Sequence, residues 1–165
     1  MSLEVIYNRV VVALAVVAGA ILAAMALMIS VEVGLRACCS SAIFGLTDLT
    51  EHALAAATFL AAPWVLARNA HVSVDIVTIT LPPAIRHRLA RVVDLVGAAV
   101  CVALSWYTLK ALLIAVERGS MVRGILVVPE WITFASPALS GALLAIGFLL
   151  RAAHGQRDRP SAPGL

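Results

Sequence analysis

The amino-acid sequence predicts an all-α integral membrane protein, a four-transmembrane-helix bundle. Of its 165 residues, 62% are hydrophobic and only 13% are charged, and the mean hydropathy is +1.03. A soluble domain of this size has no interior large enough to hide so many apolar side chains. The chain also contains four long apolar runs, each close to the roughly 20 residues that cross a bilayer. Because these runs do not alternate with a period of two, helices rather than barrel strands are expected.

The first predicted span covers residues 10–34. Its run from Val10 to Val31 contains no charged residue. This run is too long for a signal peptide, and the residues before it include Glu4 and Arg9, so we expect the mature protein to keep it.

The second predicted span covers residues 48–67 and opens with polar residues. Asp48, Glu51 and His52 must lie at an interface or face protein, because unpaired charges are costly in lipid. Pro63 is expected to kink this helix. Small residues of the same helix, Ala53, Ala56, Ala57 and Ala61, would let another helix approach closely.

The third and fourth predicted spans cover residues 89–116 and 130–150. Asp94 and Lys110 lie near the two ends of the third span, where we expect them to reach the headgroups. Trp131 suits an interfacial anchor at the start of the fourth span. Residues 1–154 would then form one membrane domain, followed by a polar, disordered tail at residues 155–165.

Basic residues predict the orientation. With the N-terminus in the cytoplasm, eight basic residues fall on the cytoplasmic side and four on the opposite side. The first group is Arg9, Arg68, Arg86, Arg88, Arg91, Arg151, Arg157 and Arg159, and the second is Arg36, Lys110, Arg118 and Arg123. The positive-inside rule therefore favours two cytoplasmic termini.

The connection between the second and third spans predicts a short helix along the membrane surface. Ser73 or Asp75 can cap such a helix, and Pro82 and Pro83 can end it and start the next one. The nearby arginines would pair with anionic headgroups at about 1 kcal/mol each.

Several classes of site are not expected. The formal net charge of +3 is too small and scattered for a nucleic-acid surface. Cys38 and Cys39 are adjacent and fit neither a disulfide framework nor a metal motif, so the cysteines are interpreted as small apolar fillers. His52 has no facing histidine that would complete a haem site. No catalytic, cofactor or metal site is predicted.

Two polar groups have alternative interpretations. Glu32 and Glu51 could form a proton or cation site, or they could be structural acids near span ends, with Glu51 paired to a basic group of a partner. Arg68, His71 and Asp75 could form a metal cluster, but zinc requires about four ligands. The structural interpretation is that Asp75 hydrogen-bonds Arg68 or His71 and so fixes the loop.

A set of residues follows a characteristic order and spacing along about residues 5–152, and its most specific part is the string R-x-x-H-V-x-V-D-x5-L-P. The set comprises Glu32, Arg36, Glu51, Arg68, His71, Val72, Val74, Asp75, Leu81, Pro82, Pro129 and Trp131. With these residues the chain resembles the small membrane subunit of tripartite ATP-independent periplasmic (TRAP) transporters, the DctQ-like proteins. Two departures, Thr50 in place of a second acid and Ala61-Ala62-Pro63-Trp64 in place of a glycine-containing stretch, bear on helix contacts.

The resemblance implies a non-catalytic scaffold in the bacterial inner membrane. In such systems a periplasmic binding protein delivers a carboxylate solute, and a large multispan subunit carries it with a sodium gradient. The small subunit braces the large one. A self-sufficient proton- or cation-coupled transporter, working as a homo-oligomer through Glu32 or Glu51, is the alternative. A membrane enzyme or a haem carrier lacks a suitable constellation of residues.

The connection between the third and fourth spans contains Arg118 and Arg123. Its charge and glycines would suit docking of a periplasmic protein, and a plain solvated turn fits equally well.

Overall fold

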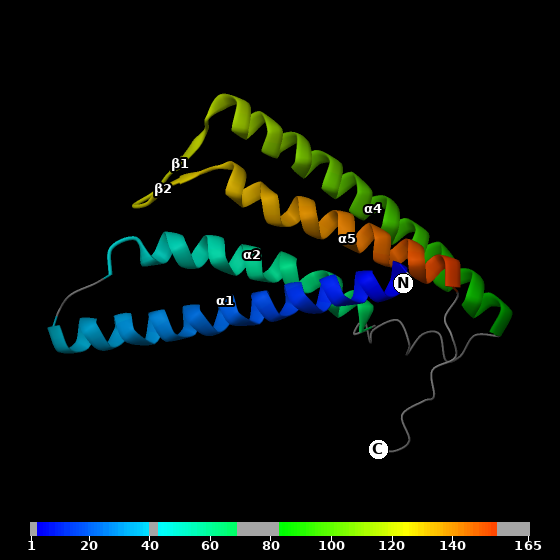
Figure 1. Ribbon diagram of the computed structural model, residues 1–165, viewed down its shortest axis with the longest axis horizontal. Helices are drawn as coiled ribbons and strands as arrows, with labels where there is room; N and C mark the ends of the chain where they lie inside the picture. The colour runs from blue at the N-terminus through cyan, green and yellow to red at the C-terminus, as the bar shows by residue number, and fades with distance from the viewer. Residues whose placement is uncertain (1–2, 40–42, 69–82, 155–165) are drawn as a thin grey trace, which may run out of the picture.

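The computed structural model describes residues 3–39, 43–68 and 83–154 (Figure 1). Its helices are α1 (Leu3–Cys39), α2 (Leu46–Ala67), α4 (Pro83–Arg118) and α5 (Trp131–His154). Its strands are β1 (Met121–Arg123) and β2 (Val127–Pro129), which join α4 to α5. The predicted interfacial helix and the predicted disordered tail fall on residues 69–82 and 155–165, which lie outside the described residues.

All four predicted spans are confirmed as helices that are long and apolar enough to cross a membrane. They are Val5–Cys38, Leu46–Ala67, Arg88–Arg118 and Trp131–Ala153. Two helices are longer than predicted, since α1 has 37 residues and α4 has 36. At about 1.5 Å per residue each is about 55 Å long, against about 30 Å of hydrocarbon. Both helices therefore extend beyond the hydrocarbon or cross it at a tilt.

The helices form an open row rather than a closed bundle. α1 packs on α2, α2 on α5, and α5 on α4. Within the described residues, no comparable contact joins α1 to α4. Figure 1 shows that the pair α1 and α2 and the pair α4 and α5 converge near the N-terminus and diverge toward β1 and β2. We call these the terminal end and the hairpin end. An open row suits a membrane, because lipid covers apolar outer faces without cost.

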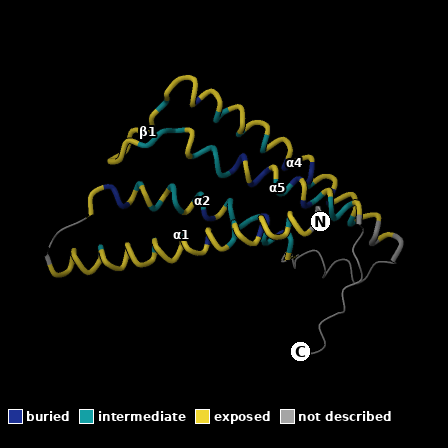
Figure 2. Tube along the Cα trace, viewed as in Figure 1, coloured by how far each residue is buried: buried dark blue, intermediate teal, exposed yellow. Residues whose placement is uncertain are grey.

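The two inner helices of the row, α2 and α5, are more buried than the two outer helices, α1 and α4. Figure 2 shows exposed residues along most of α1 and α4. In the most apolar part of each helix, 6% of the residues are buried in α4 and 33% in α5. Of the four alanines predicted to favour close approach on α2, Ala57 packs within the chain, with only 1% of its surface exposed. The outer faces of α1 and α4 are thus the free surfaces of the row.

Small residues bring α4 and α5 into backbone contact. A Cβ atom added at Gly141 would lie 3.0 Å from the backbone nitrogen of Ser105 and 3.2 Å from the carbonyl oxygen of Cys101. The hydroxyl of Ser105 donates a hydrogen bond to the carbonyl of Ala138 at 3.0 Å. Cys101 is buried at this contact, as expected of a small apolar filler. Close packing of this kind drives helix association in lipid.

At the terminal end, α1 also contacts α5, beside the last turn of α2. The hydroxyl of Tyr7 donates a hydrogen bond to the carbonyl of Leu143 at 3.2 Å. Gly147 leaves the space for this hydroxyl and for the side chain of Leu66. The first and last helices are therefore joined directly at this end.

The connection between α4 and α5 contains a short β hairpin within an otherwise helical fold. Strands β1 and β2 pair antiparallel, with Met121 opposite Pro129, Val122 opposite Val128 and Arg123 opposite Val127. The β-branched valines favour strands, but three residues on each side are too few to predict a hairpin from the sequence. In contrast, α4 begins at Pro83, as predicted from the preference of proline for the first turn.

Candidate functional site

The central part of the predicted motif lies outside the described residues. This part comprises His71, Val72, Val74, Asp75, Leu81 and Pro82. Arg68, just before it, stacks on α2, with its guanidinium carbon 5.4 Å from the centre of the Trp64 ring. Such a cation–π contact holds an arginine near a membrane surface. Hydrogen bonding of Asp75 to Arg68 or His71 stays a prediction.

The two predicted membrane carboxylates do not form one site. Glu32 pairs with Arg36 one turn along α1, with 3.3 Å between Oε1 and Nη2. The side chain of Glu32 is 18% exposed and that of Arg36 is 68% exposed. Glu51, on α2, is exposed, and no hydrogen bond or ion pair joins it to Glu32 or to another described residue. A shared ion site of Glu32 and Glu51 is thus not assembled within the chain.

At the hairpin end, Asp48 links the start of α2 to the turn between β1 and β2. Its carboxylate accepts a hydrogen bond from the backbone N–H of Leu126 at 3.0 Å. Leu126 lies between β1 and β2, 78 residues further along the chain. Gly124 lies against the same carboxylate, and the Leu126 side chain covers Gly45, whose φ of +78° favours glycine. Asp48 therefore faces protein, one of the two positions predicted for it.

Replacing Asp48 with Ala should release the hairpin from α2. The lost charge-assisted hydrogen bond contributes about 1.5 kcal/mol, which corresponds to roughly tenfold faster opening. Hydrogen exchange at the Leu126 amide measures this opening directly. Glu51→Ala, which removes an exposed carboxylate from the same helix, is the control and should leave that exchange unchanged. Equal exchange rates in both variants would contradict the assignment.

Asp94 is covered by protein and paired with Arg151, and its depth relative to the headgroups stays a prediction. The residue is 6% exposed, and its Oδ1 lies 3.6 Å from Nε of Arg151 on α5. A charge in a membrane helix is stabilised by an opposite charge when protein covers it. The sequence signal was present, since the two residues lie near the same end of consecutive antiparallel spans. Lys110, at the other end of α4, lies 5.2 Å from the centre of the Trp106 ring.

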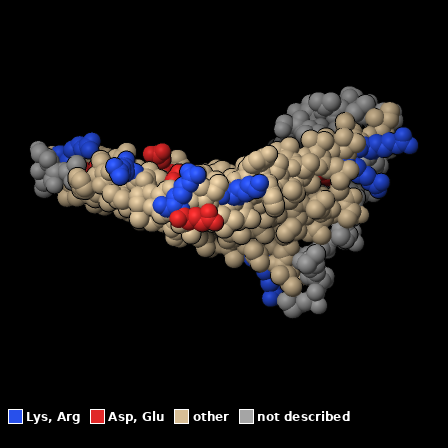
Figure 3. All heavy atoms as spheres, turned by 90° about the horizontal axis from the view of Figure 1, so that it is seen from above, with Lys and Arg blue, Asp and Glu red and all other residues tan. Residues whose placement is uncertain are grey.

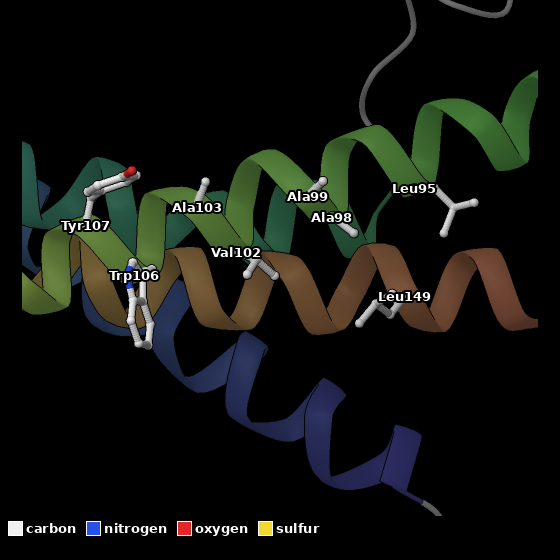
Figure 4. A pocket seen from close by; sticks show the side chains of 8 residues that line it. All are labelled: Leu95, Ala98, Ala99, Val102, Ala103, Trp106, Tyr107 and Leu149. Atoms are coloured by element: carbon white, nitrogen blue, oxygen red, sulfur yellow. The ribbon is translucent and has the colours of Figure 1, made fainter.

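A wide groove runs along the outer face of α4 beside α5 (Figure 4). Its volume is about 540 Å³. It is lined by Leu95, Ala98, Ala99, Val102, Ala103, Trp106, Tyr107 and Leu149. In the close-up, Trp106 and Tyr107 stand toward one end and Leu95 and Leu149 toward the other. This apolar groove suits hydrocarbon or a partner's side chains and offers no charged group to a polar solute.

The remaining predicted site residues lie at the hairpin end. Arg118 ends α4 and Arg123 ends β1, and both are exposed. Pro129 ends β2, and Trp131 begins α5 with 43% of its surface exposed. Docking of a periplasmic protein here stays a prediction, which reversal of both arginine charges and transport measured at low salt would test.

Uncharged surface dominates the face shown in Figure 3. In the described parts of the chain, no three His, Cys, Asp or Glu side chains come together as metal ligands would. The described contacts are helix packing, the hydrogen bond that holds the β1–β2 connection to α2, and an ion pair covered by protein.

Comparison with known protein families matches residues 25–158 to the family described as tripartite ATP-independent periplasmic transporters, DctQ component. The match takes in α2, α4, α5 and the second half of α1. A search of curated proteins finds no match. Because the family match extends over most of the 165 residues, the chain belongs to the DctQ family, the small, non-catalytic membrane components of TRAP transporters.

Proposed function

We propose that this chain is the scaffold subunit of a sodium-coupled TRAP importer. In this proposal a periplasmic binding protein delivers a carboxylate-containing solute, and a large multispan membrane subunit carries it across the bacterial inner membrane. The chain braces the large subunit and takes no direct part in solute or ion binding. Membership of the DctQ family supports the assembly, and the arrangement of the helices supports the bracing role.

The observation that carries the proposal is the open row itself. Its outer helices α1 and α4 present long apolar faces, whereas Asp94, the most deeply buried carboxylate of the described residues, is paired with Arg151. A transporter working alone needs ionisable groups that face a pathway through the membrane. Among the described residues, Glu32 instead lies beside Arg36, and Glu51 is exposed near the start of α2. The main feature of the row is therefore the apolar surface of α1 and α4, on which helices of a partner can pack.

Reconstitution into vesicles tests the proposal. The chain alone should transport none of a panel of carboxylate solutes, with or without a sodium gradient. Co-reconstitution with the large subunit and the binding protein should give sodium-dependent uptake of one of them. Uptake by the chain alone would overturn the scaffold role and favour the homo-oligomeric transporter. In that case Glu32→Gln and Glu51→Gln would identify the coupling carboxylate.

We further propose that both termini lie in the cytoplasm. At the terminal end of the row, the described helices carry Arg9, Arg68, Arg88, Arg91 and Arg151, and the hairpin end carries fewer basic residues. This asymmetry agrees with the positive-inside rule.

Cys38 provides a test of this orientation. It is an exposed free thiol near the hairpin end of α1, whereas Cys101 is buried. In a Cys39→Ser background, a membrane-impermeant maleimide added to spheroplasts should label the chain, and Cys38→Ser should abolish the labelling. Labelling that requires lysis of the inner membrane would reverse the orientation.

A further inference from the structure

A smaller pocket lies where α4 ends and α5 begins. Its volume is about 250 Å³. The apolar part is lined by Ala111, Ile114, Ala115 and Phe134, and the polar part by Arg118, Ser120 and Glu130. Unlike the groove of Figure 4, it therefore combines apolar walls with two side chains of opposite charge.

The polarity of the pocket changes with depth in the membrane. Ala111 and Arg118 lie on one face of α4, seven residues apart, which is about 10 Å along the helix axis. Arg118 ends one candidate span and Trp131 begins the next, so the charged part lies at the level of the headgroups. The apolar part then faces the hydrocarbon. A ligand that matches both parts is charged at one end and apolar at the other.

The two charged side chains have no partner within the described residues. The ion pairs found there are Glu32 with Arg36 and Asp94 with Arg151. The backbone N–H of Glu130 donates a hydrogen bond to the carbonyl of Ser120 at 3.0 Å, which holds the two sides of the pocket together. Arg118 and Glu130 therefore stand at a fixed opening, each available to a group of opposite charge.

We propose that this pocket binds one molecule of phosphatidylethanolamine. The phosphate meets the guanidinium of Arg118, the ammonium donates hydrogen bonds to the carboxylate of Glu130, and an acyl chain lies along Ala111 and Phe134. Phosphatidylglycerol would satisfy Arg118 but brings no positive charge to Glu130, and its net negative charge would repel that carboxylate. Phosphatidylcholine carries a quaternary ammonium, which has no N–H to donate. This inference does not rest on the proposed transport function.

The lipid preference of the full chain tests the proposal. The chain is placed in nanodiscs with equal amounts of phosphatidylethanolamine, phosphatidylglycerol and phosphatidylcholine, and the retained lipids are counted by native mass spectrometry. Retention of phosphatidylethanolamine should exceed that of each other lipid by about fivefold, the effect of one headgroup contact. Equal retention of the three lipids would overturn the proposal.

Matched variants assign the preference to the pocket. Glu130→Gln should remove the preference for phosphatidylethanolamine over phosphatidylglycerol, while Glu117→Gln, at an exposed carboxylate outside the pocket, should keep it. Arg118→Gln should lower the retention of phosphatidylethanolamine and of phosphatidylglycerol about fivefold, whereas Arg123→Gln should leave the retention of both unchanged. Circular dichroism checks that each variant is folded. Equal effects of Glu130→Gln and Glu117→Gln, or of Arg118→Gln and Arg123→Gln, would overturn the assignment.

Discussion

Replacing Gly141 with Leu should separate α4 from α5 and destabilise the protein by about 3 kcal/mol, the upper end of the cost of overpacking. The space that the leucine needs is already filled by backbone, since even a Cβ atom would lie 3.0 Å from the nitrogen of Ser105. A flexible side chain could move aside, but a few backbone atoms of a helix cannot shift alone without breaking hydrogen bonds within that helix. The two helices would have to move apart, and the hydrogen bond from Ser105 to Ala138 would be lost.

Gly19→Leu is the matched control for this substitution. Gly19 lies on α1, and nothing lies within 4 Å of a Cβ atom added there. The same change in side chain should therefore leave stability unchanged or slightly improved, because leucine favours helix more than glycine does. A titration with a denaturing detergent, followed by tryptophan fluorescence, measures both variants. Equal unfolding midpoints would show that the close approach of α4 and α5 contributes nothing to stability.

Removing Arg151 should have the second-largest effect, because Asp94 would then be covered by protein without its partner. Arg151→Met should destabilise the protein by about 2 kcal/mol, less than the 3–5 kcal/mol typical of fully buried pairs. The reduction is expected because the arginine side chain is 27% exposed, so that protein does not cover the pair completely. The double variant Asp94→Leu with Arg151→Met should recover most of the loss, since it leaves no unpaired charge.

Arg36→Met is the matched control, because it breaks the ion pair with Glu32 on the exposed face of α1. An exposed pair one helical turn apart contributes about 0.3–0.5 kcal/mol. The same detergent titration should therefore show a much smaller loss of stability for Arg36→Met than for Arg151→Met. If the double variant is as unstable as Arg151→Met, the cost comes from lost packing of the arginine stem rather than from the unpaired carboxylate.

The spans of this protein were predictable because each is decided by its own residues. A run such as residues 131–150 contains no charge, and lipid forces it to be helical whatever its neighbours are. Contacts between spans depend on which helices become neighbours, and periodicity carries little of that information when all faces are apolar. The ion pair of Asp94 with Arg151 was not predicted for this reason, since the two residues are 57 positions apart in the chain.

The candidate site was predictable to a smaller extent. Asp48 was identified as a polar residue that had to face protein or an interface, but its partner, the amide of Leu126, carries no sequence signal because every residue except proline has one. The pocket between Arg118 and Glu130 depends on the short hairpin that brings the two residues together. The charged residues alone predicted only a connection between two spans. The pocket exists because the β1–β2 hairpin brings Arg118 and Glu130 to the same opening.

The order of the row bears on how the chain enters the bilayer during synthesis. Neighbours in the row that are also consecutive in the chain, α1 with α2 and α4 with α5, can associate as soon as the second helix of each pair leaves the ribosome. Asp94 and Arg151 belong to the same pair, so their charges neutralise each other at the moment of insertion. The contacts between the two pairs are the packing of α2 on α5 and the hydrogen bonds from Tyr7 to Leu143 and from Leu126 to Asp48, and they can form only after the chain beyond α4 is made. A defect in all three would leave both pairs inserted but unjoined.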